Sequence, residues 1–399
     1  MGFAHEGIAD HGYTECFLCH LVFEYLSVYR FLPVTLGASL RLIQDRITLP
    51  TNRSDDAASF AREAGESLLK KLINDPFDMV EEMVEGYVAA NDQIIKRVGK
   101  RSIARANSPI PGKVGIVVGG GSGHLPAFAG YVGKGMADGA AFGNVFASPP
   151  AKPVIEATLA VNSGAGVMYT YGNYQGDCIN FDKAQDKCRE MGIKVQTVVL
   201  NDDVLSAPRD QAHKRRGIGG LFLVWHVAGA KAEQLASLDE VVAVTAKANA
   251  NTRTVGVGLT SCIVPANGKP TFSLPDNEME IGLGIHGEPG IKRVKVRPID
   301  SVIDEIMDAI LADLDYKGSD VALLVNGLGG SPAEELYVVY RRVKQICDAN
   351  KINIKFKHVG NQVTALEMQG TSVSLLRLDS EMHDLIKNTT VDTCMYKKV

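Results

Sequence analysis

Short apolar runs in this chain end in glycine-rich loops, and helical segments separate the runs. Apolar residues 114–118 lead directly into GGGSGHLP at residues 119–126. Residues 166–171 and 195–200 have the pattern of strands, and residues 184–191 between them have the pattern of a helix. Strands that alternate with helices form parallel or mixed sheets covered by helices, and these sheets bind ligands beyond the carboxyl ends of their strands. The sequence therefore predicts an α/β fold with its site among these loops.

The composition is that of a globular protein with room for more than one domain. The 399 residues are 45% hydrophobic and 22% charged, with a formal net charge of -4. This charge provides no strongly basic patch, so nucleic acid is excluded as a partner. The seven cysteines, an odd number spread thinly, indicate reduced thiols in a cytoplasmic protein and argue against a disulfide framework.

Residues 1–67 differ from the rest, and we expect a poorly ordered N-terminal extension there. Residues 16–40 are apolar and aromatic, but His20, Glu24 and Arg30 interrupt them, so we predict no membrane-spanning helix. No basic region or clear cleavage site indicates a signal peptide. CFLCH, which starts this segment, matches the attachment pattern of c-type haem, but nothing else in the sequence supports haem attachment.

His286 is the most informative single residue, because glycines stand close on both sides of it. The run IGLGIHGEPG leaves the imidazole open to a small molecule at close range. A neutral imidazole can ligate a metal, move a proton or attack a carbonyl carbon. The glycines also match the dinucleotide pattern G-x-G-x-x-G. A polar alternating segment before them and Pro289 after them exclude the strand and helix that this pattern needs, so we interpret the match as accidental.

Two other loops place polar side chains at strand ends. His124 ends the first glycine run, which lacks the lysine of a phosphate-binding loop and the third glycine of a dinucleotide fingerprint. The backbone amides of this run suit a phosphate or a hydroxyl-rich ligand. Asp177 lies in the second loop, and by itself it is better explained as the N-cap of a helix that begins near Asn180.

Two charged segments have structural explanations. Asp300, Asp304 and Asp308 recur once per helical turn and could hold magnesium, but isoleucines at core spacing beside them favour a solvated acidic face. The basic run at residues 213–216 could bind an anion, but it is more typical of a surface loop.

Five segments occur in an order that resembles the substrate-binding (K) subunit or domain of the dihydroxyacetone kinase family. They are GGGSGH at residues 119–124, GNYQGD at 172–177, RGIGG at 216–220, GLGIHGEPG at 282–290 and VNGLGGSP at 325–332. The resemblance extends from about residue 68 to the C-terminus. It implies a two-domain α/β fold. Residues 68–250 would form a mixed, mostly parallel sheet flanked by helices, and residues 251–399 a smaller α+β domain.

The resemblance also implies roles for single residues. In the family, the histidine that matches His286 adds to the ketone carbonyl of the substrate as a hemiaminal, which glycerol cannot form. The residue that matches Asp177 acts as a base toward the terminal hydroxyl, and the one that matches His124 hydrogen-bonds to the substrate. The implied site lies at the domain junction. Its substrate-binding positions are Gly121, Ser122, Gly123, Gly172 and Gly176.

Gly172 and Leu125 depart from the family pattern, in which lysine and glutamate are common at these positions. Loss of the lysine removes a cation from the pocket and is expected to leave space. These variants look more like the branch that includes the tetrulose (erythrulose) kinases. Our hypothesis is therefore a ketose one CHOH unit longer than dihydroxyacetone.

The sequence shows no nucleotide site and no metal site of its own. A kinase must place a nucleotide and magnesium against the acceptor, and in the family a separate helical L subunit or domain holds them. The resemblance implies a homodimer that needs an L-type (DhaL-like) partner carrying Mg²⁺ with ATP, or with ADP that a phosphotransferase-system protein recharges. Two alternatives stay open: a non-catalytic ketose-sensing transcriptional co-activator of the same fold, and a stand-alone ketose-binding or lyase-like protein.

Overall fold

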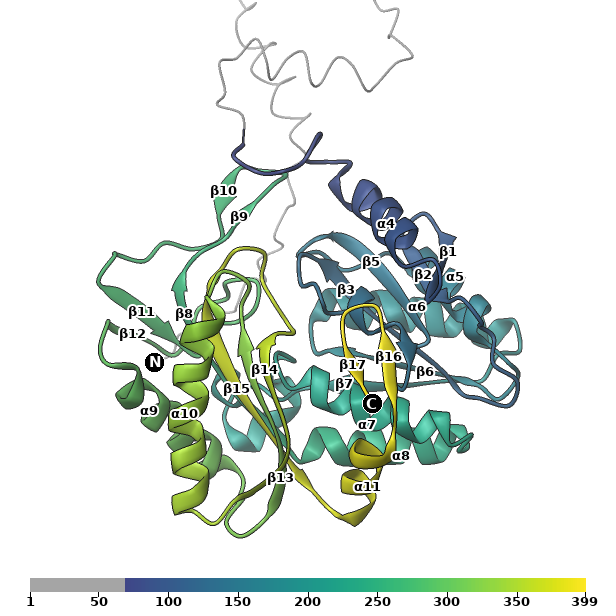
Figure 1. Ribbon diagram of the computed structural model, residues 1–399. Helices are drawn as coiled ribbons and strands as arrows, with labels where there is room; N and C mark the ends of the chain where they lie inside the picture. Colours follow the sequence, from purple (N-terminus) through teal and green to yellow (C-terminus); the bar gives the residue numbers. More distant parts are fainter. Residues whose placement is uncertain (1–68) are drawn as a thin grey trace, which may run out of the picture. The chain divides into compact units, whose positions relative to one another are not determined.

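Two six-stranded sheets organise residues 69–399, which are the residues that the computed structural model describes (Figure 1). The N-terminal extension predicted at residues 1–67 lies outside the described residues.

The first sheet is mixed. In spatial order its strands are β1 (Ile95–Gly99), β2 (Ser102–Arg105), β5 (Gly139–Val145), β3 (Gly115–Ser122), β6 (Val167–Gly172) and β7 (Val195–Leu200). The pairs β5–β3, β3–β6 and β6–β7 are parallel, whereas β1–β2 and β2–β5 are antiparallel. Strands β3 and β6 are buried along their whole length, as expected for strands with helices on both faces.

The second sheet is mostly antiparallel. In spatial order its strands are β12 (Lys292–Lys295), β11 (Glu278–Ile281), β8 (Thr252–Thr260), β15 (Gln369–Leu378), β13 (Asp320–Gly327) and β14 (Asn353–Asn361). Only the pair β13–β14 is parallel. Helices α9 (Ile299–Asp313) and α10 (Ala333–Ala349) cover one of its faces, where their apolar stripes share a hydrophobic cluster with β8, β13 and β15.

Helix α7 (Leu221–Glu233) lies between the two sheets, and eleven of its thirteen residues are buried. A helix that is apolar on all sides must be covered on all sides. Its hydrophobic cluster includes residues from both sheets, from α4 (Met79–Ala90) and from α8 (Leu238–Ala250). Residues 68–399 thereby form one compact unit. The division into domains 68–250 and 251–399 stays a prediction.

The remaining elements are short or lie at the periphery. Helices α5 (Ala151–Val161) and α6 (Gln175–Glu190) cover the other face of the first sheet, and α11 (Ser380–Asn388) packs against α7. The minor strands are β4 (Gly133–Lys134), β9 (Ile263–Val264), β10 (Lys269–Pro270), β16 (Val391–Thr393) and β17 (Lys397–Lys398). Three 3-10 helices are η1 (Ala129–Tyr131), η2 (Val204–Ser206) and η3 (Arg209–Lys214).

The predicted α/β architecture is confirmed, with differences at the glycine-rich segments. The strand expected at 195–200 has the bounds of β7, but β3 continues through the first glycines to Ser122. The run expected to be a loop is thus partly strand. It contains glycine because its neighbours are close: a β-carbon at Gly119 would meet the carbonyl oxygen of Ala141 on β5, and one at Gly120 would meet the ring of Phe128.

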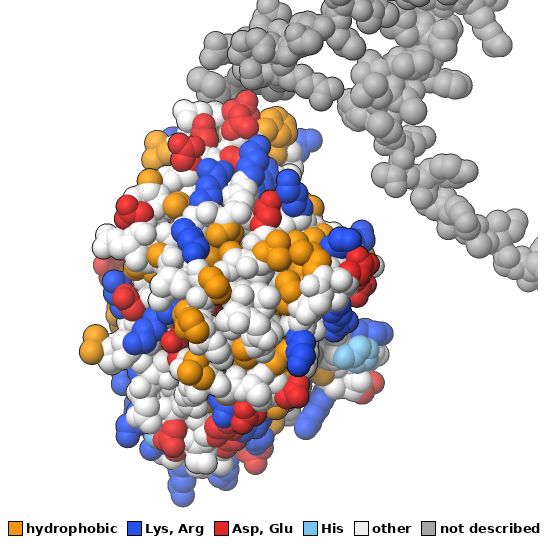
Figure 2. Space-filling model, turned by 90° about the vertical axis from the view of Figure 1, so that its right-hand side faces the viewer, with side chains coloured by type: hydrophobic (Ala, Val, Ile, Leu, Met, Phe, Trp, Pro, Cys, Tyr) orange, Lys and Arg blue, Asp and Glu red, His pale blue; other side chains and the backbone are white. Residues whose placement is uncertain are grey.

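The surface on the right-hand side of Figure 1 carries charged side chains of both signs (Figure 2). Lysines and arginines alternate there with aspartates and glutamates, and apolar side chains lie between them. Neither sign of charge covers this face, as expected for a chain with a net charge of -4.

Candidate active site

His286 and His124 are in contact although 162 positions separate them in the chain. Their Nε2 atoms are 3.0 Å apart, and their rings are nearly perpendicular with centroids 4.8 Å apart. His124 follows β3 of the first sheet, and His286 lies in the hairpin loop that joins β11 to β12 of the second. The structure therefore brings together the two histidines that the sequence singled out.

His124 is held as a neutral ring by the loop that precedes β15. It is 1% exposed, and its Nδ1–H donates to the carbonyl oxygen of Thr364 at 2.6 Å. Burial lowers the pKa of His124 to about 3, with a further contribution from the charge of His286. Because a carbonyl only accepts hydrogen bonds, Nδ1 must carry the proton, and Nε2 of His124 presents a lone pair to His286.

Glu288 holds the opposite side of the His286 ring. The Nδ1–H of His286 donates to Oε1 of Glu288 at 2.7 Å, and the backbone N–H of His286 donates to Oε2 at 2.9 Å. Burial raises the pKa of Glu288, but the hydrogen bond and charge of His286 outweigh this effect and lower the pKa to about 2. The ionised carboxylate is only an acceptor, so it requires a proton on Nδ1 of His286.

The two Nε2 atoms lie within hydrogen-bond distance, so a shared proton would join the rings. Nδ1 is protonated on both rings, and two facing lone pairs at 3.0 Å would repel each other. A proton on Nε2 of His286 satisfies all these contacts, because that ring then donates to Glu288 on one side and to His124 on the other. The arrangement keeps a mobile proton beside a potential nucleophile.

Asp177 lies in the first turn of α6 and is not its N-cap. The helix begins at Gln175 with Tyr174 as N-cap, so the prediction of a helix start near Asn180 is wrong. Asp177 is 8% exposed, and within residues 69–399 its Oδ1 has no hydrogen-bond partner. Burial raises the pKa of Asp177 to about 6, opposed by the Ser148 hydroxyl and by the charge of His286. A buried carboxylate with a free oxygen can accept a proton from a ligand hydroxyl.

Two aromatic rings that no sequence pattern marked as site residues enclose His286. Tyr174 lies edge-on to it at a centroid distance of 4.8 Å, and Phe146 does so at 5.3 Å while also stacking on His124 at 5.0 Å. Such rings fix the orientation of the imidazole and exclude water. Tyr174 could have been found from its place inside the second glycine-rich segment, GNYQGD. Phe146 follows β5 and gave no signal of its own.

The glycine-rich positions at the end of β3 serve close packing. A β-carbon at Gly121 would lie 2.8 Å from Cα of Phe146, and Gly123 has a φ of +99° that favours glycine. The hydroxyl of Ser122 donates to the carbonyl oxygen of Gly143 at 2.8 Å. These glycines allow the end of β3 to pack closely against the segment after β5, which carries Phe146. The Ser122 hydroxyl is hydrogen-bonded to the backbone.

Gly172 and Gly176 lie beside Tyr174 and Ser148. A β-carbon at Gly172 would lie 3.1 Å from both the ring of Tyr174 and the carbonyl oxygen of Gly217, and one at Gly176 would lie 3.2 Å from Cβ of Ser148. A side chain at position 172 would therefore begin in tight contact with the Tyr174 ring, and the expectation that this glycine leaves space in the pocket stays a prediction.

Arg215 and Arg216 are not the surface residues that their basic run suggests. Arg215 is 2% exposed and makes a bidentate pair with Asp313, at 2.9 and 2.7 Å. Arg216 donates from Nε to Asp203 at 2.9 Å and from Nη2 to the carbonyl oxygen of Gly282 at 2.8 Å. Only His213 and Lys214 of this run are exposed. The acceptors are distant in sequence, so the basic run alone could not indicate them.

The acidic face of α9 is paired with α10. Asp300 binds Arg341 and Asp304 binds Arg342, at 2.5 and 2.7 Å, and both carboxylates stay partly exposed. Among the described residues, no group of three or more His, Cys, Asp and Glu side chains could hold a metal ion. No helix in the same part of the chain is long and apolar enough to cross a membrane.

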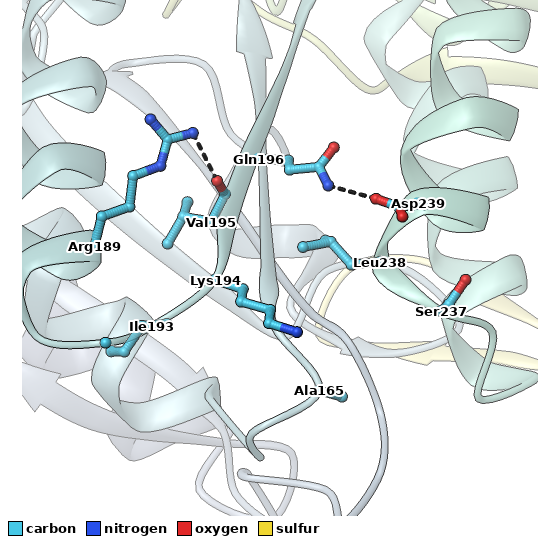
Figure 3. A pocket seen from close by; sticks show the side chains of 10 residues that line it. Ala165, Arg189, Ile193, Lys194, Val195, Gln196, Ser237, Leu238 and Asp239 are labelled. Carbon is cyan, nitrogen blue, oxygen red and sulfur yellow. Dashed lines mark hydrogen bonds between the residues drawn. The ribbon is translucent and has the colours of Figure 1, made fainter.

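A cavity of about 580 Å³ lies away from the histidines, at the amino end of β7 (Figure 3). Two pairs of its lining residues are hydrogen-bonded to each other: Arg189 donates to the carbonyl oxygen of Val195 at 2.9 Å, and Gln196 donates to Asp239 at 2.6 Å. It shares no lining residue with the histidine site. Its lining is Ala165, Arg189, Gly192, Ile193, Lys194, Val195, Gln196, Ser237, Leu238 and Asp239.

Comparisons with known proteins agree on one family. The Dak1 domain profile matches residues 85–394. The dihydroxyacetone-binding subunit DhaK of the PTS-dependent dihydroxyacetone kinase 2 of Listeria innocua is 43% identical over 332 residues, which cover 82% of this chain and 99% of that protein. The D-erythrulose kinase of Mycolicibacterium smegmatis is 42% identical over 331 residues, which cover 83% of this chain but only 57% of that protein.

A solved structure agrees with these matches. The dihydroxyacetone kinase operon co-activator DhaQ is 32% identical and has a TM-score of 0.72, with coverage of 76% of this chain and 94% of that one. The chain thus spans almost the whole of DhaK and DhaQ but little more than half of the erythrulose kinase. It belongs to the Dak1 domain family.

Proposed function

We propose that this chain is the ketose-binding subunit of a dihydroxyacetone kinase-type phosphotransferase. It binds dihydroxyacetone or a tetrulose covalently on His286 and presents the terminal hydroxyl for phosphorylation. The observation that carries the proposal is the 3.0 Å contact between Nε2 of His286 and Nε2 of His124. A dihydroxyacetone-binding subunit and a D-erythrulose kinase among the relatives support the choice of substrate class.

The covalent step uses the proton between the two histidines. Nε2 of His286 passes this proton to Nε2 of His124, and the lone pair that results attacks the carbonyl carbon of the ketose. The C=O π bond breaks, and the carbonyl oxygen takes the proton from His124 to become a hydroxyl. His286 then holds the substrate through an N–C bond, and its positive charge stays beside the carboxylate of Glu288. The reverse sequence releases the ketose.

Asp177 is the base toward the terminal hydroxyl in this proposal. With a pKa of about 6, its carboxyl is mostly ionised at pH 7 and still basic enough to accept a proton as the phosphoryl group arrives. The phosphoryl donor would be ATP, or recharged ADP, with Mg²⁺ on a separate L-type subunit. A homodimer and a cytoplasmic location stay predictions.

The test combines adduct detection with turnover. The full chain is incubated with dihydroxyacetone and analysed by intact-protein mass spectrometry, then assayed with an L-type subunit, Mg²⁺ and ATP. We expect a mass increase of one ketose in the wild type and its loss, together with loss of turnover, in His286→Ala. His383→Ala, at a partly exposed histidine on α11, is the matched control. An adduct that persists in His286→Ala would contradict the assignment.

The length of the ketose is tested in the same assay. The kcat/KM values for dihydroxyacetone, D-erythrulose and L-erythrulose are compared, and we expect at least one tetrulose to match or exceed the three-carbon ketose. The Tyr174 ring would lie 3.1 Å from a β-carbon at position 172, so room for a longer ketose beside Gly172 depends on the position of this ring. A strong three-carbon preference would restrict the function to dihydroxyacetone.

A second candidate is a ketose-sensing co-activator, because the solved structure of DhaQ has the same fold. This candidate predicts adduct formation without turnover when the L-type subunit is present. The buried Asp177 with its free oxygen favours the kinase, since a sensor needs no base toward the terminal hydroxyl.

A further inference from the structure

Arg216 connects the first half of the chain to the loop that carries His286. Its side chain is 14% exposed, and its Nε and Nη2 donate in two directions, to Asp203 at 2.9 Å and to the carbonyl oxygen of Gly282 at 2.8 Å. Its Nη1 lies 4.0 Å from Oε2 of Glu288. The guanidinium therefore contacts both the beginning of the His286 loop and the carboxylate that orients the imidazole.

Asp203 fixes the position of this guanidinium through hydrogen bonds. It is 0% exposed, and its backbone N–H donates to the carbonyl oxygen of Arg216 at 3.0 Å, so the two residues are joined by side chain and by backbone. A planar guanidinium with five N–H donors can bind a carboxylate and a carbonyl at once, which a lysine ammonium on a flexible stem cannot do with the same geometry.

Gly284 allows the guanidinium and Glu288 to meet. A β-carbon at this position would overlap the Oε2 of Glu288 and lie 2.5 Å from Nη1 of Arg216. Any other residue at 284 must push one of the two groups aside. Oε2 of Glu288 also accepts a hydrogen bond from the backbone N–H of His286. Displacement of Glu288 would therefore break its hydrogen bonds to both the backbone and the ring of His286.

We infer that Arg216 is a positioning residue for the covalent capture of the ketose. It fixes the position of the loop at residues 282–290. Glu288 then keeps its hydrogen bond with Nδ1 of His286, and Nε2 of His286 keeps its contact with His124. Arg216 does not touch the reacting atoms, and it acts only through Glu288 and Gly282. The inference rests on the proposed function and adds a residue that sets how readily the adduct forms.

The central variant is Arg216→Met, which keeps the aliphatic stem and removes the guanidinium. A misplacement of about 1 Å at a reacting group costs about 10²-fold, so we expect the adduct equilibrium constant to fall by roughly 10²-fold and KM to rise correspondingly. The kcat at saturation should fall much less, because captured ketose still faces Asp177. A purely structural defect would instead reduce the amount of active protein and leave KM unchanged.

Two further variants sharpen the readout. Arg216→Lys restores the charge but not the two-way hydrogen bonding, so we expect it to recover little of the lost adduct. Lys214→Met is the matched control: this side chain lies two residues away, is exposed, and within residues 69–399 donates only to Gln211. It should leave adduct formation and KM unchanged.

Wild-type adduct formation is measured first, so that failure of the proposed function and failure of this inference are separable. No adduct in the wild type would overturn the proposed function. A wild-type adduct together with an unchanged KM in folded Arg216→Met would overturn only the role of Arg216. If Arg216→Met does not fold, Gly284→Ala decides: loss of adduct supports the inference, and wild-type adduct formation overturns it.

Discussion

Arg215 and Arg216 are neighbours in the chain, yet they belong to two regions of different character. Arg215 and Arg253 saturate Asp313, so that both carboxylate oxygens accept hydrogen bonds from guanidinium groups. Arg216 belongs to the region of the histidines. Within residues 69–399, that region contains buried oxygens without partners, on Asp203, Tyr174 and Asp177.

The difference separates a structural ion cluster from a site that is ready for a ligand. A buried charge is tolerated when its partners satisfy it, and unpaired buried polar atoms persist chiefly where function needs them. The pKa values reflect the same contrast. Burial raises the pKa of Asp313, but Arg215 and Arg253 outweigh this effect and lower it overall. Within residues 69–399 Asp177 has no hydrogen bond from a guanidinium, and the charge of His286 offsets its burial only in part, so its pKa rises to about 6.

The largest effect on stability should come from breaking the ion cluster of Asp313, Arg215 and Arg253, which we call the saturated cluster. Asp313→Ala leaves the buried Arg215 without its partner, and removal of one member of a buried ion pair costs about 3–5 kcal/mol. Urea denaturation measures the change in the free energy of unfolding. Adduct formation per folded molecule should be unchanged, because the cluster does not contact His286.

Asp320→Ala is the control for this measurement. Asp320 pairs with Lys355 at 3.7 Å, and both side chains are more than a third exposed, so about 1 kcal/mol or less should be lost. Equal losses in the two variants would mean that the saturated cluster is no more important for stability than a surface pair.

The second prediction concerns the region of the histidines, which contains the unpartnered oxygens. Asp177→Asn should stabilise the protein, whereas Asp313→Ala should destabilise it. The folded-state pKa of about 6 lies above the ordinary aspartate value of 3.8, so the stability linked to this carboxyl is present below pH 3.8 and is lost as the pH rises through about 6. An amide never ionises. At pH 7 we therefore expect the variant to be more stable by up to about 3 kcal/mol, and this gain should vanish below about pH 4.

Turnover of Asp177→Asn should fall by about 10²–10⁴-fold, as is typical for loss of a general base. The adduct on His286 should still form, since Asp177 acts after capture. Thermal unfolding at several pH values and steady-state kinetics with the L-type subunit measure the two effects. A variant that is less stable than the wild type at pH 7 would show that the carboxylate is satisfied after all.

These two regions also show what the sequence could predict. Local patterns indicated β7 at its observed bounds and the helix α9, and the family resemblance indicated His286, His124 and Asp177. Contacts across long separations could not be predicted. Nothing near Arg215 points to Asp313, which lies 98 positions away, and nothing near His124 points to the carbonyl of Thr364, 240 positions away.

The N-cap prediction for Asp177 was wrong for a physical reason. Asp is a preferred N-cap residue, so a loop-to-helix boundary was placed just after it. In the structure the helix begins at Gln175, two residues before Asp177, and Tyr174 occupies the N-cap without a side-chain hydrogen bond. Asp177 is therefore not a capping residue. Its raised pKa follows from its burial, which the local sequence does not reveal.

The smallest effect should come from the cavity in Figure 3, where Arg189 is hydrogen-bonded to Val195 and Gln196 to Asp239. Asp239→Ala removes the acceptor for Gln196 and an acid from the first turn of α8, and each contribution is small at an exposed helix end. We expect a loss of at most about 1 kcal/mol in the free energy of unfolding and no change in adduct formation or turnover. If Asp239→Ala impaired capture of the ketose, cavity size would be a better guide to function in this fold than unpartnered buried oxygens. If it does not, this cavity is only a gap in packing, and the contact between His124 and His286 marks the site.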